Sequence, residues 1–335
     1  MAKLAVVGVG GWGHNVLRNF VDLLGSDRVV ACDSDEARID FIRTHYPDIQ
    51  IEPGYSRLLK NRSIEAVALA TPAITHFDLA FQALSAGKHT FVEKPIAMRP
   101  PEAQQLIDLA EERQRVLMVD HLLMYQPSVQ KLRALIADGA LGRVLHLHGR
   151  RLNFGTIRTE ENVFWSLGPH DISVVLYLLD EDPVQARASG ASFLQDGIED
   201  IATLDLGFAS GTQVHLQWSW LDPVKTRRLV VVGETTMAVL DETADVPLQL
   251  VHKHVERSAD RRLVMHDDGA APVPTDPTPP LEAACRDFLK SMDIGSPPIS
   301  DGRVGLRVLN VLDAAHRSIA EGGLPIRLHA KARAS

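Results

Sequence analysis

The first third of the chain alternates short apolar runs with segments whose apolar residues recur every three or four positions. The short runs are rich in β-branched residues and apolar on both faces, which is typical of strands in a parallel sheet covered by helices. The predicted strands are Lys3–Gly8, Arg28–Cys32, Ile64–Ala70, His89–Glu93 and Val116–Val119. This alternation predicts a doubly wound βαβ domain over residues 1–120.

Residues 121–335 follow another pattern, in which polar and apolar positions alternate as in strands with one face in a core. The predicted strands are Arg143–Leu152, Val184–Phe193, Ile201–Phe208, Gly211–Ser219, Arg228–Gly233 and Met237–Asp241. Residues 266–280 are rich in Asp, Pro, Gly and Ala, which predicts a mobile loop. Helices are predicted over Leu281–Met292 and Val304–Glu321, and they could pack back on the first domain. The fold class is therefore α/β with two domains.

Composition narrows the class of protein. Hydrophobic residues make up 45 % and charged residues 23 % of 335 residues, as in ordinary globular proteins. The net charge of −8 argues against a nucleic-acid-binding protein. Cys32 and Cys285 are too few for a disulfide framework, and no ligand-spaced pair suggests a metal. Since no apolar run approaches 18 residues, we expect a cytoplasmic protein without a signal peptide or a membrane partner.

The first predicted strand runs into Gly8-Val-Gly10-Gly11-Trp12-Gly13, which fits G-x-G-x-x-G and opens a helix. In this motif the first glycine makes a tight turn and the second lets backbone N–H groups approach a pyrophosphate. The third lets the helix pack close to the strand. Asp33 ends the second strand, where a carboxylate can bond a ribose 2′-hydroxyl and would repel a 2′-phosphate. The motif predicts NAD, with NADP as the alternative because Arg38 lies nearby; a glycine-rich turn without nucleotide is the competing interpretation.

Phe91-Val-Glu93-Lys94-Pro95 ends another predicted strand, at the sheet edge where ligands bind in such folds. Lys94 would face the nicotinamide side of the crevice, where it could stabilise a reacting hydroxyl or transfer its proton. Pro95 restricts Lys94 to extended backbone and is a candidate for a cis peptide bond. From these residues alone, a salt-bridged surface lysine before a turn is the better interpretation.

Three ordered motifs change that interpretation: the glycine motif, Ala70-Thr71-Pro72 with His76, and Glu93-Lys94-Pro95. With them the chain resembles the Gfo/Idh/MocA oxidoreductase family over nearly its whole length. The resemblance implies a Rossmann domain followed by an α/β domain with a large, mostly antiparallel sheet, which commonly forms the interface of a homodimer or homotetramer. It also implies that Lys94 is catalytic. The residues expected to bind the cofactor are Gly8, Gly10, Gly11, Trp12, Gly13, Asn15, Asp33, Thr71, Pro72, His76 and Glu93.

The segment Trp165–Ser173 precedes a strongly apolar helical stretch, Val174–Leu179. The family often has an Asp four residues before a His at this helix start, and the His acts on the reacting hydroxyl. His170 matches that histidine, and an imidazole suits proton exchange with an alcohol near neutral pH. Ser166 stands at the Asp position, which leaves His170 and Lys94 as the expected catalytic pair. A buried structural histidine is the alternative.

Further polar residues are candidates for binding the substrate. Arg151, Asn153 and Arg158 are expected on a loop before His170, and arginine forks suit an anionic substrate. A solvated loop with internal salt bridges is the alternative. Asp171 is expected to orient His170, cap the helix or bind a neighbour. His121 and Tyr125 follow the last strand of the first domain and should enter the cleft, after Asp120, where the family usually has glycine.

Within the family, residues 11–15, 153–162 and 169–173 resemble the nucleotide-sugar branch, whose best-known members oxidise C3 of a UDP-N-acetylglucosaminuronate-type sugar. We therefore predict an NAD(P)-dependent oxidoreductase that transfers hydride between the cofactor and a ring secondary alcohol or ketone of a sugar, with a nucleotide sugar as the leading candidate. The runner-up is a cyclitol or free-sugar dehydrogenase, or an NADPH-dependent ketosugar reductase. A non-catalytic NAD-binding regulator or a scaffold is less favoured, because Lys94 and His170 are both present.

Overall fold

The computed structural model describes residues 3–328, and these residues form two compact units. The first unit runs to Tyr125 and also contains Thr278–Leu309. The second comprises Gln126–Pro277 and continues from Asn310. Within the described part of the chain, no helix combines the length and apolar character needed to cross a membrane.

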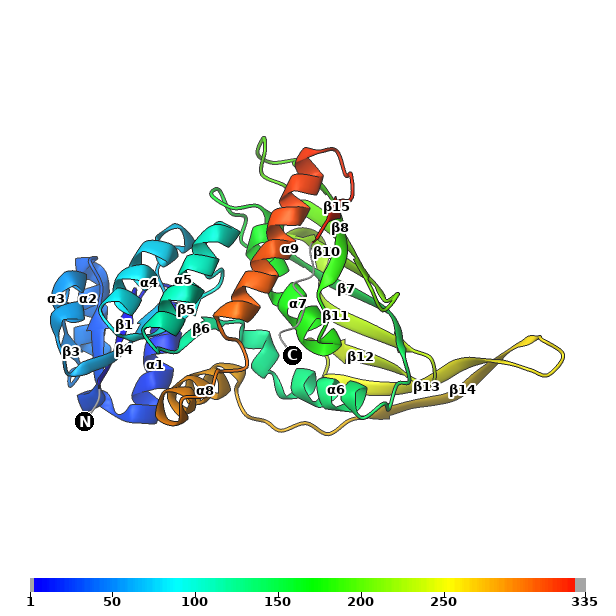
Figure 1. The fold of residues 1–335 in the computed structure, drawn as a ribbon, viewed down its shortest axis with the longest axis horizontal. Coiled ribbons are helices and arrows are strands. Elements are labelled where there is room, and N and C mark those ends of the chain that lie inside the picture. Colours follow the sequence, from blue (N-terminus) through cyan, green and yellow to red (C-terminus); the bar gives the residue numbers. More distant parts are fainter. Residues whose placement is uncertain (1–2, 329–335) are drawn as a thin grey trace. The chain divides into compact units, whose positions relative to one another are not determined.

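The first unit is built on a parallel sheet of six strands in the order β3-β2-β1-β4-β5-β6 (Figure 1). The strands are β1 (Lys3–Val7), β2 (Val29–Cys32), β3 (Gln50–Ile51), β4 (Ile64–Leu69), β5 (His89–Glu93) and β6 (Leu117–Asp120). The helices are α1 (Gly13–Leu24), α2 (Glu36–His45), α3 (Tyr55–Lys60), α4 (His76–Ser85), α5 (Pro100–Glu112) and α8 (Pro280–Ile294), with short 3-10 turns η1 (Ser26–Arg28), η2 (Ala73–Thr75) and η3 (Leu122–Tyr125). This is the doubly wound Rossmann arrangement that the strand–helix alternation predicts.

An aromatic cluster shows why α8, which comes late in the chain, belongs to this unit. Phe20 of α1 and Phe288 of α8 meet Phe91 of β5, with ring centroids 5.6 to 6.3 Å apart in edge-to-face arrangements. All three side chains are fully buried. Burying three phenylalanines contributes on the order of 5 kcal/mol or more to the stability of the unit, which fixes α8 against the sheet.

The second unit contains a sheet of nine strands in the order β14-β13-β12-β11-β7-β10-β9-β8-β15 (Figure 1). Neighbouring strands are antiparallel except for β7 and β10. The strands are β7 (Val144–Phe154), β8 (Pro183–Ala191), β9 (Ile201–Phe208), β10 (Gln213–Ser219), β11 (Leu221–Gly233), β12 (Met237–Asp241), β13 (Leu248–Arg257), β14 (Leu263–Pro272) and β15 (Ile326–Arg327). The helices are α6 (Pro127–Ala137), α7 (Val163–Leu179) and the end of α9 (Gly302–Ala320). The predicted α/β fold class with a large, mostly antiparallel second sheet is confirmed.

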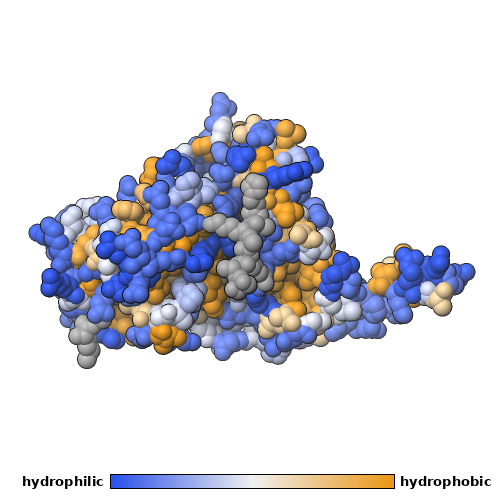
Figure 2. Space-filling view, in the orientation of Figure 1, coloured by the Kyte–Doolittle hydropathy of each residue, from blue (hydrophilic) through white to orange (hydrophobic). Residues whose placement is uncertain are grey.

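Several segments of this unit differ from the sequence prediction, including α6 and β13, for which no element was predicted. Residues 266–272 belong to β14 rather than to a loop, and they pair with β13 in a hairpin that extends beyond the rest of the sheet (Figure 1). In the space-filling view this hairpin is a narrow projection from the surface (Figure 2). Leu263 and Met265 of β14 are 65 % and 85 % exposed, so backbone pairing rather than burial holds the strand and no hydrophobic alternation marks it. Helix α7 already begins at Val163, because the Asn162 side chain caps it by accepting from Trp165 N at 2.9 Å.

Candidate cofactor and catalytic site

The glycine motif lies between β1 and α1, and two of its glycines are required by contacts. Gly8 has φ +83°, and a Cβ there would lie 2.8 Å from Ala70 O. A Cβ on Gly13 would lie 1.9 Å from Gly8 O, so only glycine lets α1 approach the strand. Gly10 and Gly11 have open space where a Cβ would point, which leaves room for a phosphate to approach the backbone. This geometry fits a pyrophosphate-binding loop.

Asp33 is held beside this loop. Its Oδ2 accepts from Val9 N at 2.7 Å, and its Oδ1 accepts from Asp35 N at 3.0 Å. The carboxylate follows the last residue of β2, the position from which a Rossmann acid reaches the ribose. Helix α1 begins without a side-chain cap, and Asn15 lies in its first turn. The N–H groups of His14 and Asn15 donate to Gly10 O at 3.3 Å and to Trp12 O at 2.8 Å, both within the glycine motif. Trp12 is 44 % exposed at the start of the same helix.

His76 joins the two other motifs of the first unit. Its Nδ1 lies 2.7 Å from Pro95 O and its Nε2 lies 2.8 Å from Thr71 O, and the ring is buried. Burial lowers the pKa of His76, so the ring is neutral and donates to one of these carbonyls at a time. The Lys94–Pro95 bond is cis, as predicted. His76 thus holds the loop that follows β4 against the loop that carries Lys94, and Pro72 is exposed between them.

The ends of β5 and β6 place two carboxyl groups together. Glu93 and Asp120 are register partners in the parallel pair, and Asp120 is 1 % exposed. Burial raises the pKa of both groups, and the charge of Asp120 raises that of Glu93 further. The positive charge of Lys94 acts in the opposite direction and lowers the pKa of both carboxyl groups. The sequence marked Asp120 as a departure from the family, but its pairing with Glu93 becomes visible only through the strand register.

The two residues expected to enter the cleft after β6 are both buried. His121 is 2 % exposed, and burial lowers its pKa to about 3, so the ring is neutral. Tyr125 is also 2 % exposed, and its hydroxyl donates to Asp287 Oδ2 at 2.8 Å and accepts from Ser300 N at 3.2 Å. Because these bonds occupy the hydroxyl, the expectation that Tyr125 binds substrate is replaced by a structural role: it ties η3 to α8.

In the second unit, Arg151 is committed to internal partners. It lies in β7, within the predicted strand Arg143–Leu152 and not on the loop that carries Arg158, and its side chain is 8 % exposed. The guanidinium donates to Asp171 Oδ2 and Oδ1, both at 2.9 Å, and to Glu242 Oε1 at 2.6 Å. Burial opposes the charged form, but the two carboxylates outweigh it and raise the pKa of Arg151. Arg151 is therefore no longer proposed as a substrate ligand.

Asp171 binds this neighbour rather than capping α7. Its Oδ2 also accepts from Trp218 Nε1 at 2.7 Å, so β7 and β10 both hold the residue that follows His170. His170 lies inside α7, and Ser166 lies one turn before it and is buried. Asn153 is part-buried in β7, whereas Arg158 is 54 % exposed and pairs loosely with Glu161 at 3.8 Å. Lys94 belongs to the first unit and His170 to the second.

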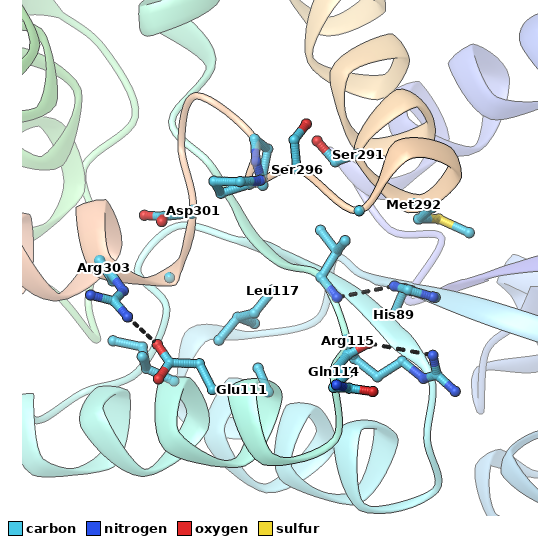
Figure 3. Close-up of a pocket in the computed structure, with 17 residues that line it drawn as sticks. His89, Glu111, Gln114, Arg115, Leu117, Ser291, Met292, Ser296, Asp301 and Arg303 are labelled. Atoms are coloured by element: carbon cyan, nitrogen blue, oxygen red, sulfur yellow. Dashed lines mark hydrogen bonds and ion pairs between the residues drawn. The ribbon is translucent and has the colours of Figure 1, made fainter.

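A separate pocket of about 780 Å³ lies at the other edge of the parallel sheet (Figure 3). It is lined by His89 and Leu117, the first residues of β5 and β6, whereas Glu93 and Asp120 are the last. The Arg303–Glu111 ion pair lies on its wall, and His89 Nδ1 accepts from Val116 N at 3.0 Å. These three side chains are thus paired within the protein. The candidate chemistry lies at the carboxyl edge of the sheet instead.

Comparison with known proteins agrees with this geometry. The NAD-binding Rossmann-fold model of the Gfo/Idh/MocA oxidoreductase family matches residues 2–121, and the family's C-terminal domain matches residues 129–239. The chain is 30 % identical to the UDP-N-acetylglucosamine 3-dehydrogenase of Acidithiobacillus ferrooxidans over 258 residues, 73 % of this chain and 76 % of the relative. A solved structure of that enzyme superimposes with a TM-score of 0.83 at 27 % identity, covering 95 % and 97 % of the two chains.

A second relative comes from another branch. The inositol 2-dehydrogenase of Salmonella typhimurium is 28 % identical over 186 residues, 54 % of this chain and 55 % of that enzyme. Both relatives are dehydrogenases, one of a nucleotide sugar and one of a cyclitol. The chain belongs to the Gfo/Idh/MocA family of oxidoreductases, and its first domain is the family's NAD-binding Rossmann fold.

Proposed function

We propose that this oxidoreductase transfers hydride between NAD and a ring secondary alcohol of a nucleotide sugar. The observation that carries the proposal is the placement of Lys94 at the carboxyl edge of β5, in a loop that His76 anchors, within the same unit as the pyrophosphate-binding loop. The carboxyl edge of a doubly wound sheet is where a bound nicotinamide meets its substrate.

Each residue has a defined part in this proposal. Gly10, Gly11 and the start of α1 hold the pyrophosphate, and Asp33 accepts a hydrogen bond from the adenosine ribose. The nicotinamide ring, when bound, accepts the hydride. In the oxidising direction the neutral Lys94 amine takes the hydroxyl proton as the carbinol hydrogen leaves as hydride, so the products are a ketone, the reduced cofactor and a lysine ammonium. His170 is the second group proposed to exchange that proton.

The nucleotide-sugar assignment is supported by the UDP-N-acetylglucosamine 3-dehydrogenase relative, which aligns along most of the chain. With Arg151 committed to Asp171 and Glu242, the exposed Arg158 is the arginine left among the sequence candidates to meet a substrate phosphate. The inositol 2-dehydrogenase relative supports a second candidate function, that of a cyclitol dehydrogenase. A cyclitol substrate would need no contact with a phosphate.

A substrate panel tests the proposal. Purified protein is given NAD or NADP with UDP-hexosamines, UDP-uronates, inositols and free hexoses, and the absorbance of the reduced nicotinamide is followed. Oxidation of a UDP-sugar with NAD supports the proposal, and turnover confined to inositols would move the enzyme to the second candidate. Lack of turnover in both the oxidising and the reducing direction would reject a catalytic role.

We also propose that the nine-stranded sheet supplies the interface of a homodimer or homotetramer. Alternate residues of β9 and β10 are buried on one face of the sheet, and the opposite face carries part-exposed polar side chains, among them His146, His148 and His215. Light scattering coupled to gel filtration measures the mass in solution. A monomer at all concentrations would reject the proposed interface and would leave the proposed catalytic function unaffected.

A further inference from the structure

Glu93 and Asp120 end neighbouring parallel strands at the carboxyl edge of the sheet. They are register partners, so their Cα atoms lie one strand spacing apart, about 4.8 Å, and their side chains project to the same face. Asp120 is 1 % exposed, and Glu93 Oε1 is buried. Two buried carboxyl groups at this spacing cannot both be ionised without a large cost in desolvation and repulsion.

Hydrogen bonding leads to the same conclusion. If both groups were ionised, Glu93 Oε1 and both Asp120 oxygens would lack a well-formed hydrogen bond from any residue in the described range 3–328. The Trp12 indole favours the ionised form of each carboxyl group but does not satisfy these three oxygens. A proton held between the two carboxyl groups turns one of them into a donor to the other, which removes part of this deficit.

We propose that Glu93 and Asp120 share one proton and together present a single negative charge to Lys94. This inference rests on the proposed function for the importance of Lys94, not for the state of the pair. Glu93 and Asp120 are positioning residues here: the charge of the pair stabilises the lysine ammonium and so sets the pH above which Lys94 can accept a hydroxyl proton.

The other titratable groups around the pair are neutral near pH 7. Burial lowers the pKa of His121 to about 3, and burial also lowers the pKa of His76, which lies near Lys94. Burial and the two carboxyl groups raise the pKa of the Cys285 thiol on α8. Lys94 is the cation that acts on both carboxyl groups. A negative charge on the pair therefore favours the ammonium form of Lys94.

Counting charges gives a sharp test with Glu93→Gln, Asp120→Asn and the double variant. Either single variant replaces a shared proton by an amide and keeps one negative charge, so the titration of Lys94 stays near its original pH. The double variant removes the charge and lowers the pKa of Lys94 by about one to three units. The readout is competitive acetylation of lysine amines across a pH series, followed by mass spectrometry, with no substrate or cofactor present.

Each alternative charge state gives a different pattern. A shift in each single variant, with a larger shift in the double variant, would show that both groups are ionised, and an unshifted double variant would show that the pair is neutral; either result overturns the proposal. Asp108→Asn, at an exposed position on α5, is the matched control, and exposed Lys131 is the reference amine.

A second measurement tests the proposal on the unmodified protein, in case the variants do not fold. Infrared spectra of the unmodified protein at neutral pH should contain the C=O stretch of a protonated carboxyl group, and a spectrum without that band would overturn the proposal. Neither readout requires turnover. Failure of the substrate panel therefore rejects the proposed function alone, whereas failure of the acetylation pattern rejects the shared proton alone.

Discussion

Arg151 and Asp171 form a two-pronged ion pair in which Nε and one terminal nitrogen of the guanidinium each donate to a carboxylate oxygen at 2.9 Å. The pair joins β7 to the middle of α7, and Trp218 of β10 donates to the same carboxylate at 2.7 Å. Asp171 directly follows His170, so the pair fixes the turn of helix that carries the proposed catalytic imidazole. Because replacing a whole buried ion pair by apolar residues often costs no stability, we infer that this pair serves mainly to orient the helix.

Asp171→Ala should therefore lower both stability and turnover. It leaves the buried Arg151 with Glu242 as its remaining carboxylate partner, and breaking a buried pair costs about 3 kcal/mol or more. The urea midpoint measures this loss. Arg158→Ala removes an exposed, loose pair and should change the midpoint little. If the two variants lost equal stability, the network around Arg151 would not have the role assigned here.

Lys94→Ala should reduce the catalytic rate constant by roughly 10²- to 10⁴-fold, the usual contribution of a positioned acid–base group. The NAD dissociation constant should change little, because the amine is proposed to act on the substrate hydroxyl. Steady-state kinetics and nucleotide fluorescence titration measure the two quantities, and Lys131→Ala, at an exposed position of α6, is the control. A decrease in the catalytic rate constant matched by a similar decrease in NAD affinity would assign Lys94 to cofactor binding.

Short sequence patterns predicted the elements whose formation depends on residues close together in the chain. The glycine motif needs a strand, a tight turn and a helix in succession, and His89–Glu93 and Ile201–Phe208 are strands within the predicted limits. Strand β14 escaped prediction because pairing with β13, rather than burial, holds it. A periodicity argument detects only strands with a buried face.

The site predictions that the structure led us to revise have a different origin. Arg151 had the right chemistry for an anionic substrate, but its partners Asp171 and Glu242 lie 20 and 91 residues away in sequence. Tyr125 is likewise bonded to Asp287, which is 162 residues away. Residue type indicates which partners a side chain can take, and only the fold decides whether the protein itself supplies them.

Gly13→Ala should destabilise the first unit or abolish NAD binding. The added Cβ would lie 1.9 Å from Gly8 O, a backbone atom that cannot move without displacing β1, and overpacking of this kind costs about 1–3 kcal/mol or more. Gly11→Ala is the matched comparison for stability, since its Cβ meets open space. Thermal unfolding without cofactor should separate the two variants. Equal melting temperatures would contradict the close approach of α1 to the strand.

Asp33→Ala should weaken NAD binding by tenfold or more and NADP binding less, because the lost hydrogen bond is made by a charged acceptor to the ribose. In the unmodified protein the Asp33 carboxylate repels the 2′-phosphate of NADP, and the variant removes this repulsion. Calorimetric titration with each nucleotide gives both dissociation constants. An unchanged ratio of the two would mean that Asp33 does not contact the ribose.

His121 should make the folded state sensitive to acid. Burial lowers its pKa to about 3 in the folded chain, whereas an unfolded histidine titrates near pH 6.5. The unfolded chain therefore binds more protons between these values, and the free energy of unfolding falls as pH drops through this window, by at most about 1.4 kcal/mol per unit for this group. His121→Phe keeps the shape and removes the titration. Urea unfolding at several pH values below neutrality should give a shallower dependence for the variant than for the unmodified protein, and identical slopes would show that His121 is not held neutral in the folded state.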